Sequence, residues 1–110
     1  MRLINRTPHP IVVMDKENKI IARIEPEGDP IRLEEKLMGC DTIETDKGKF
    51  LICNKELKIG NLPEIKKDVI YIVSMPVAQS VKRSDLVSPD EYVRDKEGKI
   101  IGIRSFKRII

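Results

Sequence analysis

Three residues of this chain could take part in acid–base or nucleophilic chemistry: His9, Ser74 and Asp85. His9 is the only histidine and lies between Pro8 and Pro10, and a proline favours an extended backbone in the residue before it. A histidine held on such a corner could act as an acid–base group, with Ser74 or Asp85 as its partner. No GxSxG motif and no glycine-rich phosphate loop accompanies these residues. The sequence therefore favours a protein that is not an enzyme and keeps catalysis as the alternative.

Three arginines, Arg83, Arg94 and Arg104, stand close in sequence to Asp85 and Asp95. A guanidinium group can hold a carboxylate or a phosphate through two parallel hydrogen bonds. These arginines are therefore our candidate site for a small anionic ligand. Structural pairing between arginine and aspartate is the simpler alternative, and it would tie segment 84–92 to its neighbours.

The two cysteines, Cys40 and Cys53, are not spaced as a CxxC pair, and one histidine completes no zinc set. We therefore expect neither a metal nor a cofactor. If the turn at 46–49 pairs Thr45 with Phe50, Thr42 faces Cys53 and Cys40 lies two residues out of register. That register argues against a disulfide, so both cysteines are predicted to be small buried apolar residues.

The net charge of +3 is concentrated near the C-terminus, where residues 96–110 hold five basic side chains and one acidic one. Such a strand could lie along a phosphate backbone, although basic residues on an edge strand also prevent strands of different molecules from pairing. The chain has four aromatic residues, too few for a base-stacking platform. Nucleic-acid binding is therefore a less favoured alternative.

Length and composition indicate one globular domain covering residues 1–110. Lys and Glu are abundant and Gln occurs once, a composition expected of a thermophile. No apolar run approaches the ~20 residues that span a bilayer, and the N-terminus lacks the pattern of a signal peptide. We therefore expect a cytoplasmic protein without membrane contact, and the sequence leaves its oligomeric state open.

The segment DKENKII at 15–21 returns as DKEGKII at 95–101, and DKGKFLI at 46–52 is a looser copy. Apolar β-branched residues flank each copy, and Asp at the start with Gly or Asn late in the segment is typical of a turn. Identity does not extend beyond the turns and their flanks. The three copies are therefore predicted to be exposed hairpin turns without a function of their own.

The remaining segments complete a fold prediction. Residues 69–75, VIYIVSM, are apolar on both alternating faces, which predicts a central strand with Ile72 in the core. Residues 77–83 follow a proline and are predicted to form a short helix. Segment 31–40 could be strand or helix, with strand favoured, and 84–92 is predicted to be a loop. Together these elements predict a β-rich α+β domain whose antiparallel hairpins form a partly closed barrel or half-barrel.

Four segments also carry a resemblance to a known family: NRTPHPIVV, GNLPEI, IVSMPVAQSV with RSDLVSP, and VRDKEGKIIGIRSF. Through them the chain resembles a family of small uncharacterised archaeal, bacterial and phage proteins. The resemblance covers most of the chain and is weakest at 31–56. It implies no activity, and its phage association suggests an accessory role by analogy alone.

The sequence best supports a non-enzymatic domain that binds a small anionic ligand or a protein partner. The first alternative is a small enzyme using His9 with Ser74 or Asp85. The second is an accessory nucleic-acid-binding protein that uses the basic C-terminal strand.

Overall fold

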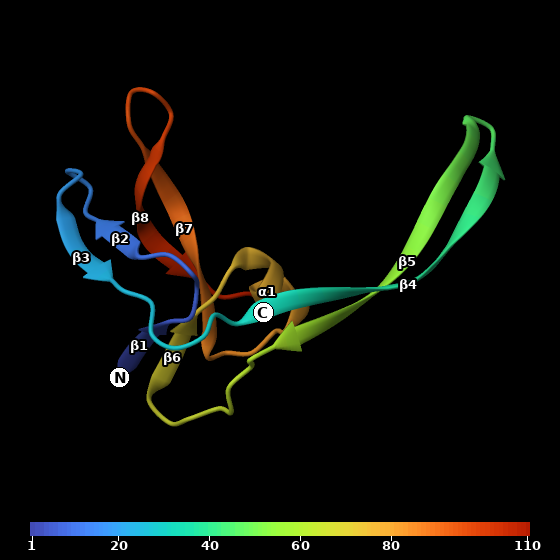
Figure 1. The fold of residues 1–110 in the computed structure, drawn as a ribbon. Coiled ribbons are helices and arrows are strands. Elements are labelled where there is room, and N and C mark those ends of the chain that lie inside the picture. Colours follow the sequence, from blue (N-terminus) through green and yellow to red (C-terminus); the bar gives the residue numbers. More distant parts are fainter.

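Six of the eight strands form one mixed sheet in the computed structural model, which describes residues 1–110 (Figure 1). Strands β1, β6 and β7 run parallel to one another, β7 and β8 form an antiparallel hairpin, and so do β2 and β3. The order is β1-β6-β7-β8-β2-β3. The bounds are β1 Arg2–Asn5, β2 Ile11–Met14, β3 Ile20–Ile24, β6 Val69–Ile72, β7 Leu86–Arg94 and β8 Ile100–Lys107.

The other two strands form a long hairpin that projects from this sheet (Figure 1). Strand β4 spans Arg32–Thr45 and β5 spans Gly48–Gly60; we call residues 32–60 the arm and the remainder the body. Because the arm extends outward, the radius of gyration is 18.0 Å, whereas a compact chain of this length has about 13 Å. The arm therefore gains little burial from the body beyond its base.

The main core lies between the sheet and helix α1, Met75–Ser80. Pro76 is tolerated because the first turn of a helix needs no N–H donor there. Tyr71 and Leu86 from the sheet pack with Val77 from the helix, and Leu33 and Ile59 at the base of the arm close the cluster. Ile72 is fully buried, as its apolar strand predicted.

Asn5 joins the two edge strands of the sheet. Its side chain is fully buried, and its amide nitrogen donates to the backbone oxygens of His9 and Ile24 at 2.8 and 2.9 Å. Its Oδ1 accepts from the backbone N–H of Thr7 at 2.9 Å. Strand β1, the corner at 7–10 and the end of β3 thus meet at one side chain, and a single parallel bridge between Asn5 and Pro26 lies beside it.

The two close copies of the repeated turn adopt the same hydrogen-bonded structure. Asp15 Oδ1 accepts from the backbone N–H groups of Glu17 and Lys19, and Asp95 Oδ1 accepts from the equivalent groups two and four residues on. The late positions, Asn18 and Gly98, both have positive φ. The middle copy differs, because Thr45 Oγ1 closes its turn. The turns are exposed, as predicted.

The β-rich fold with antiparallel hairpins and one short helix is confirmed, and segment 31–40 is strand from Arg32 onward. No closed barrel forms, so the partly closed barrel or half-barrel remains a prediction. The helix begins at residue 75 and ends at residue 80, earlier than the predicted 77–83. The fold fits a single domain.

Two predictions about strands are wrong. Segment 84–92 is mostly strand β7 rather than loop. Strand β6 pairs with β7 only at Leu86 and Val87. The edge of β7 that faces β6 is therefore unpaired at Pro89, and a proline is tolerated there because it has no N–H to donate. The basic C-terminal segment is not an edge strand, because β8 lies between β7 and β2. Gly102 of β8 allows β2 to lie this close, because a Cβ at position 102 would be 2.7 Å from Met14 Sδ.

Replacing Asn5 by Ala should destabilise the protein by more than about 2 kcal/mol, because two carbonyl oxygens and one N–H would lose their buried partner. Chemical denaturation of the wild type and Asn5→Ala measures this loss. A change below 1 kcal/mol would show that water replaces the amide.

The turns allow a matched comparison within one loop. Asp15→Ala and Asp95→Ala should each cost about 1.5 kcal/mol, because each removes a carboxylate that accepts two backbone hydrogen bonds. Glu17→Ala and Glu97→Ala, in the same loops, should change the unfolding free energy by less than ~0.5 kcal/mol. Equal losses for the Asp and Glu variants would contradict the proposed turn structure.

Candidate functional site

The three candidate arginines lie at separate places, and each donates hydrogen bonds to its own chain. Arg83 binds Asp85, Arg94 Nη1 donates to the carbonyl oxygen of Gly98 at 2.9 Å, and Arg104 donates to the carbonyl oxygen of Asp15 and to Asn18 Oδ1. Arg94 therefore supports the turn on its own hairpin, whereas Arg104 joins β8 to the turn between β2 and β3. No contact brings the three guanidinium groups together.

The pair formed by Arg83 and Asp85 is the best-defined polar contact of the body. Arg83 Nε and Nη2 donate to the two carboxylate oxygens at 2.9 and 2.5 Å, and Nη1 donates to the carbonyl oxygen of Pro63 at 2.9 Å. The side chains are 18% and 8% exposed. Arg83 thus ties the segment before β6 to the start of β7, which is the structural pairing considered as the simpler alternative.

The hydrogen bond from Asp85 raises the pKa of Arg83 further above its usual strongly basic value, although burial opposes the rise. A group whose pKa is higher in the folded state stabilises the fold below its unfolded-state pKa, and it loses this effect only as the pH rises through the folded-state value. Arg83 therefore remains charged and stabilising throughout the neutral and moderately alkaline range.

The catalytic candidates show no catalytic arrangement. His9 is exposed, and its backbone oxygen accepts hydrogen bonds from the side chains of Asn5 and Thr7, whereas its imidazole has no partner. Ser74 is an exposed residue at the start of α1 and makes no side-chain capping bond. Asp85 is occupied by Arg83. No hydrogen bond links His9 to Ser74 or Asp85.

Cys40 and Cys53 form a disulfide, and both are exposed on the arm. The expectation of two buried free cysteines is therefore wrong. The turn is two residues shorter than assumed: Thr45 pairs with Gly48 rather than with Phe50, so Cys40 and Cys53 are direct cross-strand partners. The shift of two residues in register brings the sulfur atoms together.

The arm exposes apolar side chains that sequence reasoning did not single out. Apolar runs in a strand indicate burial, and only the fold shows that the body leaves both faces of this ribbon uncovered. Seven large apolar side chains of the arm are exposed: Leu37, Met38, Ile43, Phe50, Leu51, Ile52 and Leu57. They make the arm a candidate contact element of the molecule.

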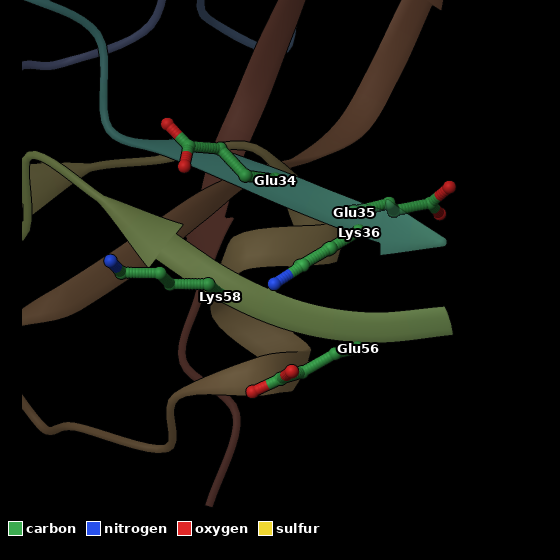
Figure 2. A pocket seen from close by; sticks show the side chains of 5 residues that line it. All are labelled: Glu34, Glu35, Lys36, Glu56 and Lys58. Carbon is green, nitrogen blue, oxygen red and sulfur yellow. The ribbon is translucent and has the colours of Figure 1, made fainter. Parts of the chain in front are cut away.

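A hollow of about 330 Å³ lies near the base of the arm (Figure 2). Its walls are charged side chains only, and Figure 2 shows Glu35 directed away from the other four. Lys36 faces Glu56 and Glu34 faces Lys58 across the ribbon, so these four charges balance. The fifth lining residue, Glu35, is paired with Lys55, which leaves no free charge for a charged ligand. The lining residues are Glu34, Glu35, Lys36, Glu56 and Lys58.

A second, mostly apolar hollow of about 450 Å³ is lined by Ile70 and Val87, which alternate along their strands with Tyr71 and Leu86 of the core cluster. Its two basic residues already have partners, since Lys107 lies 3.6 Å from Asp90 and Arg108 donates to the carbonyl oxygen of Ser84. It therefore presents no convergent polar groups. The remaining lining residues are Met1, Leu3 and Phe106.

Comparison with known proteins gives no match: no protein family, no curated protein and no solved structure is similar enough to place the chain.

The one helix has six residues, so no helix is long enough to cross a bilayer.

Replacing Arg83 by Met should destabilise the protein by about 3 kcal/mol, because the largely buried carboxylate of Asp85 would lose its charged partner. Arg94→Met is the matched control and should change stability by about 0.5 kcal/mol, since Arg94 is exposed. Thermal denaturation of both variants measures the difference.

Thermal denaturation of the wild type, Arg83→Met and Arg94→Met in the presence of anions also tests the predicted anion site. If Arg83 or Arg94 binds an anion, phosphate or sulfate at matched ionic strength should stabilise the wild type and not the variant. Equal destabilisation of the two variants would contradict the structural assignment of Arg83.

Proposed function

We propose that this protein is a non-enzymatic interaction domain whose arm binds a protein partner. The supporting observation is the arm itself, which projects from the body (Figure 1) and carries seven exposed large apolar side chains. Large exposed apolar patches mark interaction sites in soluble proteins, and Phe and Met are among the residues enriched at such interfaces.

The stability of the ribbon also favours a partner. A two-stranded hairpin alone is marginally stable in water, and long strands with open edges tend to pair with other chains. In the arm, a strand of 14 residues pairs with a strand of 13 residues, and neither pairs with any other strand. A bound protein would cover the apolar side chains and complete the second layer that the ribbon lacks.

Charge separates this proposal from the alternatives. The arm holds six acidic and six basic residues, so it has no excess positive charge for a phosphate backbone. The arginines expected to bind a small anion already donate to oxygens of the chain. These contacts favour a protein partner over an anionic ligand, and the lack of a link between His9 and Ser74 or Asp85 gives an enzyme no support.

The resemblance to the archaeal, bacterial and phage family is part of the proposal. Its motifs fall on the body: the corner after β1, the unit of β6 and α1, and the hairpin of β7 and β8. The arm covers nearly the whole segment, 31–56, in which the resemblance is weakest. We propose that the body is the shared scaffold and that the arm gives this chain its own binding specificity.

A cytoplasmic location is likewise a proposal. Disulfides are rare in the cytosol of mesophiles but common in intracellular proteins of hyperthermophiles. The disulfide of the arm is compatible with that location if the thermophile-like composition reflects the source of the chain.

A photo-crosslinking amino acid at position 51 tests the proposed function in the cells that produce the protein. Position 51 is on the arm and position 21 is on the body, and the native side chains are 66% and 63% exposed. We expect crosslinks to a discrete protein species from position 51 and none from position 21.

Gel electrophoresis and mass spectrometry detect the crosslinked species. Absence of any crosslink from position 51, or the same species from both positions, would show that the arm is not a specific contact element.

A further inference from the structure

The disulfide of the arm lies where a thiol from outside the chain can reach it. Cys40 and Cys53 are both exposed, and they face one another across a ribbon that pairs with no other strand. The rate of thiol–disulfide exchange depends on access to the sulfur atoms, and exposed disulfides are the more readily reduced ones. Both sulfur atoms are therefore open to attack while the chain is folded.

A break in the ladder separates the disulfide from the base of the arm. The partners of the consecutive β5 residues Asn54 and Lys55 are two residues apart on β4. Met38 lies between those partners, so it is an extra residue without a partner of its own. Such a β-bulge interrupts the ladder locally and bends the strand. Gly39, which follows it, has a φ of 134°, a value that residues with a side chain rarely adopt.

The part of the arm beyond the disulfide, residues 41–52, forms a short hairpin that we call the outer arm. Its ladder joins five pairs of residues, and every one of its residues is exposed. A two-stranded hairpin of this kind is marginally stable by itself, and the bulge weakens its connection to the base. The disulfide follows the bulge directly and therefore holds the outer arm in register with the base.

We propose that Cys40–Cys53 is a site of thiol–disulfide exchange, and that its reduction by a dithiol releases the outer arm while the body stays folded. A thiolate of the dithiol attacks one sulfur atom and expels the other as a thiolate, which gives a mixed disulfide. The second thiolate of the dithiol then attacks its own sulfur in the mixed disulfide and expels the second cysteine as a thiolate. Two electrons pass to the cysteines, and the protons that the dithiol gives up protonate the two cysteine thiolates.

This inference goes beyond the proposed function, because the exchange needs no bound partner. It adds a means of control to the arm. The oxidised outer arm holds Phe50 and Ile52 on one face together with Ile43, the cross-strand partner of Phe50. A surface fixed before binding loses less conformational freedom on association, so reduction should weaken any contact that the outer arm makes.

Reduction of the native protein by dithiothreitol tests the exchange site. Alkylation followed by mass spectrometry counts the free thiols over time, with and without denaturant. The native protein should be reduced at a rate within about tenfold of the rate in denaturant, because both cysteines are exposed in the fold. Reduction that occurs only after global unfolding would overturn the proposal and leave the disulfide a structural crosslink.

Hydrogen exchange measures the release of the outer arm. Reduction should lower the protection of amides 41–52 by at least about tenfold, while the amides of β6 keep theirs. The double variant Cys40→Ser/Cys53→Ser should match the reduced wild type with and without dithiothreitol, because it lacks both sulfur atoms. Unchanged protection of the outer arm after reduction would overturn the proposal.

Deletion of Met38 is the matched control for the bulge. It removes an exposed side chain and makes the ladder continuous, with Cys40 still opposite Cys53. Because the outer arm then continues the base without a break, reduction should lower its protection by less than about threefold. A loss as large as in the wild type would contradict the role assigned to the bulge.

The exchange and protection experiments use the isolated protein, whereas the proposed function is tested by crosslinking in cells. A disulfide that resists reduction therefore leaves the interaction arm standing. Absence of crosslinks from position 51 likewise leaves the exchange site standing.

Discussion

The body depends on one buried amide. Asn5 has no exposed surface, and its side chain bonds to three backbone groups, two in the corner at 7–10 and one at the end of β3. Because β1 and β3 are the two edges of the sheet order, this side chain fixes the relative position of both ends of the sheet. A buried polar group is favourable only when its bonding capacity is satisfied. The sheet must therefore bring the corner at 7–10 and the end of β3 to Asn5 together.

The arm is held by different forces from those that hold the body. Tyr71, Val77 and Leu86 are buried in the body between sheet and helix, so the hydrophobic effect stabilises it. Beyond Leu33 and Ile59 the arm is held by its ladder of backbone hydrogen bonds, one disulfide and exposed polar contacts such as the ion pair of Glu35 and Lys55. The same chain thus combines a body with a buried core and a ribbon whose apolar side chains are exposed.

Sequence patterns predicted the hairpins and turns that depend on interactions between residues close together in the chain. The apolar β-branched residues that flank the first repeated turn form the two strands of the predicted hairpin, β2 and β3, and the aspartates that predicted the turns accept their backbone hydrogen bonds. β7 was missed because Pro89 and the polar residues beside it resemble a loop, and the open edge that accommodates a proline is visible only in the sheet. The cysteine pairing was missed because the register depends on whether the turn has two residues or four.

The candidate site was only partly accessible from the sequence. Arg83 and Asp85 are two residues apart, and they were recognised as a pair of opposite charges. Whether Arg83, Arg94 and Arg104 converge depends on the strand order, which the sequence pattern does not encode. The exposure of Leu51 could not be predicted either, because an apolar strand residue has the same signature whether it is covered by its own chain or by none.

The disulfide also closes a covalent ring around the tip of the arm. Cys40 and Cys53 are 13 residues apart in sequence, and the exposed turn at Asp46–Lys47 lies inside that ring. A protease that cut the chain at Lys47 or Lys49 would therefore open the tip without releasing either half. The two fragments would stay joined and in register, so backbone continuity at the tip is not required to keep the two strands of the arm together.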